Sequence, residues 1–226
     1  FEQIMSISRK RQYQLLQENG IEEKSDFVKI ENLKKENATV VFQGVEGAYS
    51  FAAMHTFFGD QIKSFHVDTW KDAMEEIKKG KADFAVLPIE NSTAGIVQDI
   101  YDLLTEYDHV IVGEQIIPCE HVLMGLPGTS LFDIRTVYSH PQALMQCREF
   151  LEEHRDWQQM EWNNTAAAAK KVAGDKDPSQ AAIASRYAAD HFGLAVLQEG
   201  IYSNVNNSTR FIIVTKKKIY CRDARK

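Results

Sequence analysis

The strongest constraint on the fold is an alternation that begins at Thr39. From there, short runs rich in β-branched residues alternate with segments whose apolar residues recur at helical spacing. The first three pairs are a strand over 39–43 with a helix over 50–58, a strand over 64–67 with a helix over 69–79, and a strand over 83–88 with a helix over 96–107. Such alternation predicts an α/β fold in which parallel strands are covered by helices.

The second half of the chain continues this pattern. The predicted elements are strands over 114–118, 121–126 and 136–139, a helix from Pro141, a strand over 160–162, a helix over 165–173, a strand over 181–185, a helix over 186–192 and a strand over 210–216. Proline suits a first helical position because that N–H has no partner inside the helix. For 226 residues we predict two lobes of about 100 residues each rather than one continuous sheet.

The first 38 residues differ from the rest. Residues 1–19 have a helical period that ends at Asn19-Gly20, whereas residues 20–38 are charged, weakly periodic and typical of a linker. The chain starts at Phe1, inside a helical pattern that has no cap. We therefore expect that an upstream region has been removed.

Composition excludes several classes of protein. The 32 acidic and 26 basic residues give a net charge of −6, which disfavours binding to nucleic acid. No uncharged apolar run approaches the roughly 20 residues that span a bilayer, and we expect no signal peptide because the first residues lack an apolar core and a small-residue cleavage site. Cys119, Cys147 and Cys221 form no C-x-x-C pair. We expect a cytoplasmic protein without a membrane or nucleic-acid partner.

Common cofactor and nucleophile motifs are missing from the sequence. It contains no G-x-S-x-G, Walker or G-x-G-x-x-G string, and its seven histidines show no H-x-H or H-x-x-x-H spacing. We therefore predict neither a metal site nor a cofactor.

Polar residues gather instead in the turns that follow predicted strands. The richest turns are 44–50, 88–95, 139–142 and 163–165, and a fifth polar cluster, 206–210, precedes the last strand. In open α/β folds, ligands bind beyond the carboxyl ends of strands, where helix N-termini point free N–H groups at them. Hydroxyls, amides and one guanidinium suit a small anionic molecule with several oxygens.

Each of these candidates also has a purely structural interpretation. Residues 90–92 are typical of a turn that caps the next helix, and residues 139–140 and 164–165 are typical N-caps. Within 209–210, the threonine suits a strand and the arginine suits a solvated edge. The convergence of these residues on one kind of turn favours a site.

Four segments resemble the signature segments of the prephenate dehydratase family, in the same order. They are LPIENSTAGIVQDIYDLL (87–104), VYSHPQALMQC (137–147), NNTAAAAKKVA (163–173) and NNSTRFIIV (206–214). The resemblance covers residues 39–216. It implies two α/β subdomains with a central cleft, similar to type II periplasmic binding proteins. We expect subdomain 1 over 39–113 and 205–216, subdomain 2 over 114–204, and a tail over 217–226.

The resemblance implies a carbon–oxygen lyase of phenylalanine biosynthesis. Such an enzyme converts prephenate into phenylpyruvate, carbon dioxide and water without a cofactor. Two alternatives stay open: an arogenate or cyclohexadienyl dehydratase, and a two-lobed module that binds a small carboxylate without chemistry. A homodimer is also compatible with the resemblance.

The family also implies roles for individual residues. Thr209 donates a hydrogen bond to the leaving hydroxyl, and His140 or Glu90 supplies the proton. Arg210 binds a carboxylate or orders the Thr209 loop, and Phe211 packs against the substrate ring or the cleft floor. The residues assigned to substrate positioning are Asn91, Ser92, Ser139, Gln142, Thr165 and Asn207.

The sequence departs from the family pattern in its first loop. Val45 stands where a proline is usual, and Ala48 removes a hydroxyl, so we assign the loop no catalytic role. Gly44 and Gly47 remain, and glycine permits close approach of the backbone.

Both ends of the chain also bear on the comparison with the family. Residues 1–17 resemble the last helix of a chorismate mutase domain, as in bifunctional P-proteins, with Ser8 and Gln12 at its active-site positions. We expect no mutase activity from so short a remnant. The chain has no counterpart of the regulatory ACT domain, so we expect no feedback inhibition by phenylalanine.

Overall fold

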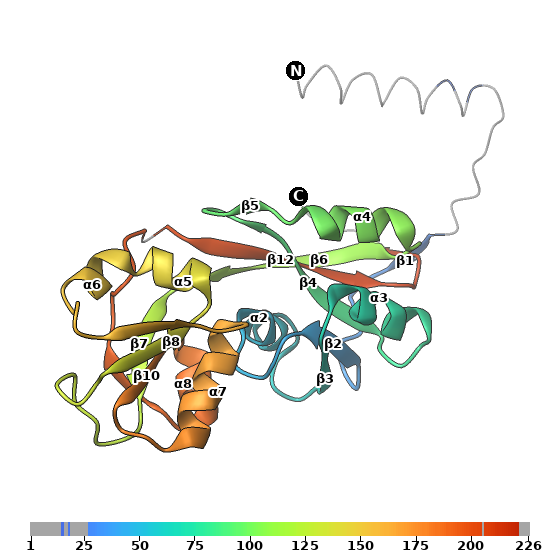
Figure 1. Ribbon diagram of the computed structural model, residues 1–226. Helices are drawn as coiled ribbons and strands as arrows, with labels where there is room; N and C mark the ends of the chain where they lie inside the picture. Colours follow the sequence, from blue (N-terminus) through green and yellow to red (C-terminus); the bar gives the residue numbers. More distant parts are fainter. Residues whose placement is uncertain (1–14, 16–17, 19–26, 205, 222–226) are drawn as a thin grey trace.

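A computed structural model describes residues 15, 18, 27–204 and 206–221. The predicted mutase-like helix, with Ser8 and Gln12, lies almost entirely outside the described residues. The described chain forms two α/β lobes, each built on its own sheet (Figure 1). The predicted two-lobed α/β architecture is therefore confirmed.

Lobe one is built on a six-stranded sheet in the order β3-β2-β4-β12-β6, with β5 paired to β4. Its strands are β2 (Thr39–Gln43), β3 (Lys63–Val67), β4 (Phe84–Asn91), β5 (Gly95–Ile96), β6 (Val110–Pro118) and β12 (Ser208–Thr215). Helix α2 (Tyr49–Phe58) packs on one face, and helices α3 (Trp70–Lys78) and α4 (Gln98–Glu106) pack on the other. Phe84 to Leu87 are buried because both faces of their strand are covered.

Lobe two is built on a five-stranded sheet in the order β11-β7-β10-β8-β9. Its strands are β7 (His121–Gly125), β8 (Thr136–Ser139), β9 (Gln158–Glu161), β10 (Gln180–Ser185) and β11 (Ala195–Gln198). Its helices are α5 (Pro141–Gln146), α6 (Arg148–Glu152), α7 (Thr165–Asp175) and α8 (Arg186–Phe192). The alanines of α7 and α8 pack against this sheet, so the Ala-rich segment serves close packing. Outside both lobes, β1 (Val28–Ile30) and β13 (Ile219–Cys221) form a parallel pair.

The expectation of parallel strands is only partly correct. β2 pairs in parallel with β3 and β4, and β8 with β9 and β10. In contrast, β12 runs antiparallel to both of its neighbours, and β7 runs antiparallel to β10 and β11. The antiparallel strands occur where the chain leaves lobe one and where it returns.

The two lobes are joined by the ends of β6 and β12. β6 leads out of lobe one and β12 leads back into it, and the two strands pair from Val110 with Thr215 to Pro118 with Ser208. Beyond the pair, the Cys119 N–H donates to the Asn207 carbonyl over 2.9 Å. The predicted boundary at residue 113 falls inside β6, because this strand stays in the lobe-one sheet as far as Pro118.

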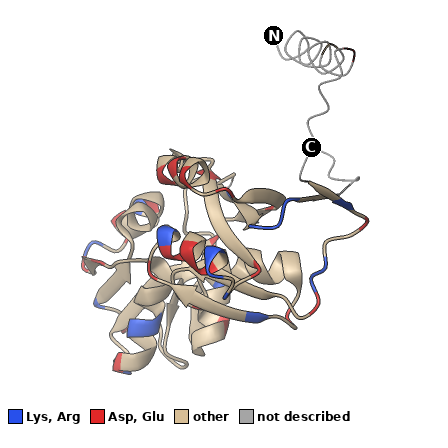
Figure 2. Ribbon diagram, turned by 90° about the vertical axis from the view of Figure 1, so that its right-hand side faces the viewer, with Lys and Arg blue, Asp and Glu red and all other residues tan. Residues whose placement is uncertain are grey.

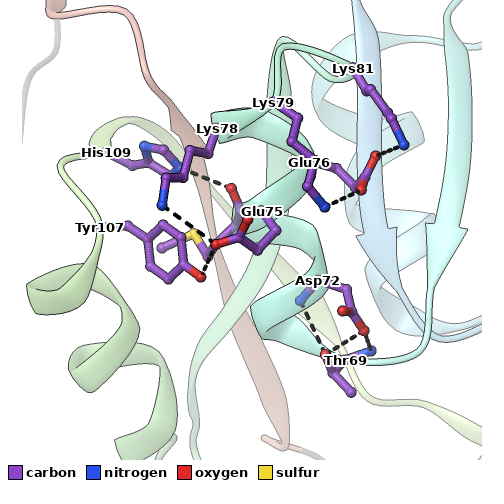
Figure 3. A network of polar contacts seen from close by, with 10 residues as sticks. Thr69, Asp72, Glu75, Glu76, Lys78, Lys79, Lys81, Tyr107 and His109 are labelled. Atoms are coloured by element: carbon purple, nitrogen blue, oxygen red, sulfur yellow. Dashed lines mark hydrogen bonds and ion pairs between the residues drawn. The ribbon is translucent and has the colours of Figure 1, made fainter.

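Local sequence accounts for the ends of several helices, and α3 shows this most fully. The Thr69 hydroxyl accepts from the Asp72 N–H, and the Asp72 carboxylate accepts from the Thr69 N–H, which together form a capping box (Figure 3). At the other end of the helix, the Tyr107 hydroxyl donates to Glu75 over 2.6 Å. His109 Nε2 lies 3.1 Å from the Met74 carbonyl. These contacts fasten α3 to the loop after α4.

Acidic and basic residues are interspersed along the ribbon of both lobes (Figure 2). Several ion pairs in the described part of the chain join two exposed groups, as in Lys71 with Glu106 and Arg148 with Glu152. Exposed pairs of this kind contribute little to stability, so the buried apolar clusters hold the fold. Within the part of the chain that the structure describes, no helix is long and apolar enough to cross a membrane.

Candidate active site at the lobe junction

A cluster of amide and hydroxyl side chains lies where β4, β6 and β12 end at the junction. Asn91 and Thr209 are cross-strand partners, and Asn91 Nδ2 lies 3.0 Å from Thr209 Oγ1. The same nitrogen lies 3.0 Å from Asn207 Oδ1 and 3.1 Å from the Ser208 carbonyl. An amide NH₂ has two hydrogens, so these three acceptors share them. Asn91 therefore fixes the position of Thr209 and leaves the threonine proton free to be donated.

Asn91 is itself held by a turn. Its Oδ1 accepts from the N–H groups of Thr93 and Ala94 over 3.0 and 2.9 Å. This is an Asx turn, and it leads into the β4–β5 hairpin through Gly95, whose φ is +87°. The side chain of Asn91 thus has both its oxygen and its nitrogen engaged.

A second set of hydrogen bonds ties the start of β12 to the same turn. The Ser208 N–H donates to Ser92 Oγ over 2.9 Å, and the Ser92 N–H donates to the Ser208 carbonyl over 2.9 Å. Asn207 is buried, and its Oδ1 accepts from Thr93 Oγ1 over 3.2 Å. Three predicted substrate-positioning residues, Asn91, Ser92 and Asn207, are therefore brought together beside Thr209.

Cys119 completes this cluster from the end of β6. Its Sγ lies 3.1 Å from Thr209 Oγ1 and 3.8 Å from Asn91 Nδ2. Burial raises the pKa of the Cys119 thiol, while its contacts with Thr209 and Asn91 oppose that shift. The group next to the Thr209 hydroxyl is therefore a neutral thiol near neutral pH.

The first loop of lobe one makes close contact with lobe two. Gly47 has φ of +84°, and a Cβ atom there would lie 2.9 Å from Cα of Ala188 on α8. Ser185 Oγ donates to the Gly47 carbonyl over 2.9 Å. The expected close backbone approach at this glycine is confirmed, and it is made to the other lobe.

Two ring side chains also meet across the junction. Tyr49 of α2 and His121 of β7 are joined by a hydroxyl–Nδ1 contact of 3.0 Å, and their rings pack edge to face. His121 Nε2 lies 2.8 Å from Gln146 Oε1 on α5. Near Gln146, residues of both lobes line a cavity of about 160 Å³; its lining is Thr93, Met145, Gln146, Tyr202, Ser203, Asn204 and Asn207.

Three predicted site residues of β4 and β12 do not join this cluster. Arg210 lies on the opposite face of β12 from Thr209, where its guanidinium pairs with Glu114. Glu90 is the cross-strand partner of Arg210 and lies on that same face. Phe211 is 3% exposed and packs in the core beneath α2. Strand alternation thus turns Arg210 and Glu90 away from Asn91, whereas Phe211 lies in the apolar core.

The predicted site residues of lobe two serve mainly as local structure in this conformation. Ser139 is fully buried and donates to the Ile183 carbonyl over 2.6 Å. His140 caps α5, its Nδ1 accepting from the Gln142 N–H over 3.2 Å, and it lines an open surface pocket of about 570 Å³. Thr165 opens α7, whose cap is Asn164.

Sequence reasoning missed several residues of the junction. They are Tyr49, Thr93, Cys119, His121, Gln146 and Asn204. Tyr49 lies in the loop to which no role was assigned, and Gln146 lies in the signature segment 137–147. No sequence pattern marked Cys119 or His121 as site residues, because the residues that they contact are remote in the sequence. Among the described residues, no group of three or more His, Cys, Asp or Glu side chains is placed to hold a metal.

The structure places this chain in the class of two-lobed α/β proteins whose lobes are joined by paired strands. Hydroxyl and amide groups gather where the two lobes join. The interface between two lobes is one of the places where small-molecule sites occur in proteins. A sequence model of the prephenate dehydratase family matches residues 40–219, so the chain belongs to the prephenate dehydratase family.

Individual relatives agree with this assignment. The bifunctional chorismate mutase/prephenate dehydratase of Escherichia coli is 34% identical over 197 residues, which cover 86% of this chain and 51% of the relative. Arogenate dehydratase/prephenate dehydratase 6 of Arabidopsis thaliana is 37% identical over 84% of this chain and 46% of its own length. The crystal structure of prephenate dehydratase in complex with L-Phe from Arthrobacter aurescens has a TM-score of 0.72 at 33% identity, over 78% of this chain and 60% of that chain. The chain spans about half the length of the curated relatives.

Proposed function

We propose that this chain is a prephenate dehydratase, a lyase that converts prephenate into phenylpyruvate, carbon dioxide and water. The observation that carries the proposal is the placement of Thr209 Oγ1 by Asn91 at the lobe junction, in a chain of this family. The proposal includes a substrate site between the two lobes. It also includes the two expected subdomains, with the boundary between them moved from residue 113 to residue 118.

The reaction breaks two bonds of the substrate ring. The bond to the ring carboxylate breaks to release carbon dioxide, its electron pair enters the ring, and the bond to the ring hydroxyl breaks so that the ring becomes aromatic. The departing hydroxide takes a proton and leaves as water. Because aromatisation drives the reaction, the protein has to orient the substrate and assist the leaving group.

Thr209 is the group that assists the leaving hydroxyl. Its oxygen already accepts from Asn91, so its own proton is available for the substrate oxygen. A threonine hydroxyl is a weak acid, and a hydrogen bond to the developing hydroxide lowers the barrier without full transfer of that proton. The neutral Cys119 thiol lies 3.1 Å from the same hydroxyl oxygen, and either group can be the donor in that contact.

His140 is the better of the two expected proton donors. Glu90 lies on the Arg210 face of the sheet, away from Thr209, whereas His140 lies at the start of α5 in lobe two. Its Nδ1 is the capping acceptor, so Nε2 is the atom that would deliver a proton. Substrate carboxylates would be held by the neutral donors at the junction, among them Ser92, Thr93 and Asn204.

Arogenate is the second candidate substrate, because relatives at 37–38% identity carry the name arogenate dehydratase. Both substrates have the same ring and differ only at the side-chain keto or amino group. The junction cluster is neutral, and we found no carboxylate among its hydrogen-bonded side chains in the described part of the chain. This composition favours a keto group over an ammonium group.

The test measures turnover of prephenate and arogenate side by side, following phenylpyruvate by its absorbance in alkali and phenylalanine by chromatography. We expect a higher kcat/KM for prephenate. A higher kcat/KM for arogenate would favour the second candidate, and calorimetric binding without turnover would favour a carboxylate-binding module. A cytoplasmic location and a homodimer belong to the same proposal and are tested by cell fractionation and light scattering.

A further inference from the structure

Tyr49, His121 and Gln146 form a continuous chain of hydrogen bonds across the lobe junction. Tyr49 belongs to α2 in lobe one, His121 opens the first strand of lobe two, and Gln146 ends α5. The contacts are 3.0 Å from the Tyr49 hydroxyl to His121 Nδ1 and 2.8 Å from His121 Nε2 to Gln146 Oε1. His121 is 4% exposed. None of the three has a role in the chemistry proposed above.

The partners of His121 determine its tautomer. Gln146 presents its Oε1, which only accepts, so His121 Nε2 carries a hydrogen. In the neutral ring, Nδ1 is then the acceptor, and the Tyr49 hydroxyl donates to it. Protonation of Nδ1 would reverse this hydrogen bond, because the imidazolium would donate to the Tyr49 oxygen and the phenolic hydrogen would lose its acceptor.

The surroundings of His121 favour the neutral ring. Burial lowers its pKa, and the hydrogen bond to Gln146 opposes that shift. The titratable groups around the pair are Cys119, Glu120, Cys147 and Tyr202, and burial raises the pKa of Tyr49 itself well above its ordinary value. On the sheet, β10 places the neutral Ser185 opposite His121, and α7 and α8 turn buried Ala and Val side chains toward β7.

The hydrogen bonds that join Tyr49, His121 and Gln146 also lie beside Thr209, the proposed catalytic residue. Cys119 contacts Thr209 Oγ1 and precedes His121 by two residues in the chain. The loop that leads into α2, just before Tyr49, includes Gly47, which packs directly on α8. A change at the Tyr49–His121 contact would therefore shift both the lobe-one loop and the surroundings of Thr209.

We propose that Tyr49 and His121 form an interlobe latch, and that neutral His121 is a positioning residue which holds the two halves of the site in register for turnover. Only the expected effect of the latch on turnover rests on the proposed function. Its geometry and tautomer are independent of the substrate.

The first test removes one partner at a time. Tyr49→Phe keeps the ring and loses the hydroxyl, and we expect kcat to fall about tenfold, with a smaller change in KM. His121→Asn keeps an acceptor near the Nδ1 position, whereas His121→Gln keeps a donor toward Gln146. Because the latch needs the acceptor for the Tyr49 hydroxyl, the Asn variant should retain more activity. The matched control is Tyr107→Phe, which deletes another bonded tyrosine hydroxyl far from the junction. Equal kcat in Tyr49→Phe and the control would overturn the latch.

The second test uses pH. In the parent chain, kcat should fall on the acid side of the profile as His121 gains a proton, at a pH below 6.5, the ordinary pKa of histidine. Gln146→Glu places a carboxylate on Nε2–H and favours the charged ring, so the acid limb of the profile should move to higher pH. An acid limb that stays in place in Gln146→Glu contradicts the role of neutral His121.

The third test does not depend on activity. Nitrogen-15 chemical shifts of His121 at neutral pH should show a neutral ring with its hydrogen on Nε2. A hydrogen on Nδ1, or a charged ring, would overturn the latch. Failure of the parent chain to convert prephenate would instead contradict the proposed function, and the histidine spectrum would still decide the latch.

Discussion

The amide nitrogen of Asn91 and the hydroxyl oxygen of Thr209 lie 3.0 Å apart on neighbouring strands, at the point where the chain passes between lobes. The pairing joins residues that are 118 positions apart in sequence. Because Thr209 lies on a strand of the sheet and not on a loop, this contact gives its hydroxyl a fixed orientation. A group that acts on a leaving hydroxyl requires such precise placement.

Asn91→Asp should lower both activity and stability. A carboxylate keeps the shape and the bonds from the Thr93 and Ala94 N–H groups, but it cannot donate to Asn207, Ser208 or Thr209. The Thr209 hydroxyl would then donate to the new carboxylate instead of to the substrate. We expect kcat to fall at least about tenfold, or about 1.4 kcal/mol in activation free energy.

The measurement for this variant is steady-state kinetics with thermal denaturation. Asn32→Asp adds the same charge at an exposed bend and serves as the control. Normal kcat in the Asn91 variant would show that the orientation of Thr209 by an amide is not required.

Arg210→Gln should have little effect on turnover. The guanidinium is about half exposed, pairs with Glu114 and lies on the face of β12 opposite Thr209. Loss of an exposed pair costs little, so we expect kcat/KM within about threefold of the parent value. Substrate titration in the turnover assay checks this, and a large rise in KM would restore the carboxylate-binding role that the family resemblance implies.

Ala48→Ser should stabilise the protein. Ala48 is the N-cap of α2, with extended backbone angles and no side-chain cap. A serine hydroxyl there can accept a free N–H of the first turn, which is worth about 1 kcal/mol. Thermal denaturation should show a higher Tm, with Ala48→Val as the control that adds bulk but no acceptor. An unchanged Tm for the serine variant would mean that its hydroxyl does not reach the helix.

Cys119 should react slowly with alkylating reagents in the native protein. Burial raises the pKa of its thiol, and burial raises the pKa of Cys147 to about 12, so little thiolate is present at neutral pH. Alkylation of Cys119 should accelerate as pH rises and on unfolding, because both changes increase the accessible thiolate. Peptide mapping by mass spectrometry follows each cysteine separately, and rapid native alkylation of Cys119 at neutral pH would contradict its burial.

Local signals in the sequence predicted much of the fold. The predicted strands over 39–43 and 136–139 and the predicted helix over 186–192 agree with the structure, because periodicity acts within a few residues. The antiparallel placement of β12 between β4 and β6 was not predicted, since it depends on pairing between segments about 100 residues apart.

The candidate site was predicted only in part, because local motifs mark some of its residues while other contacts join segments that are remote in the sequence. Asn91, Ser92, Asn207 and Thr209 share two signature segments, and the structure brings them together. The position of Arg210 follows from strand alternation combined with a register that only the fold provides. Tyr49 and His121 are joined by an interlobe contact that no local pattern encodes.

The most direct test of the proposed function is the kcat for phenylpyruvate formation by Thr209→Val and Thr209→Ser. Valine keeps the shape and the β-branch but has no hydroxyl, whereas serine keeps the hydroxyl next to Asn91. We predict that kcat falls at least about tenfold in the valine variant and stays closer to the parent value in the serine variant. Full kcat in a folded Thr209→Val protein would contradict the account.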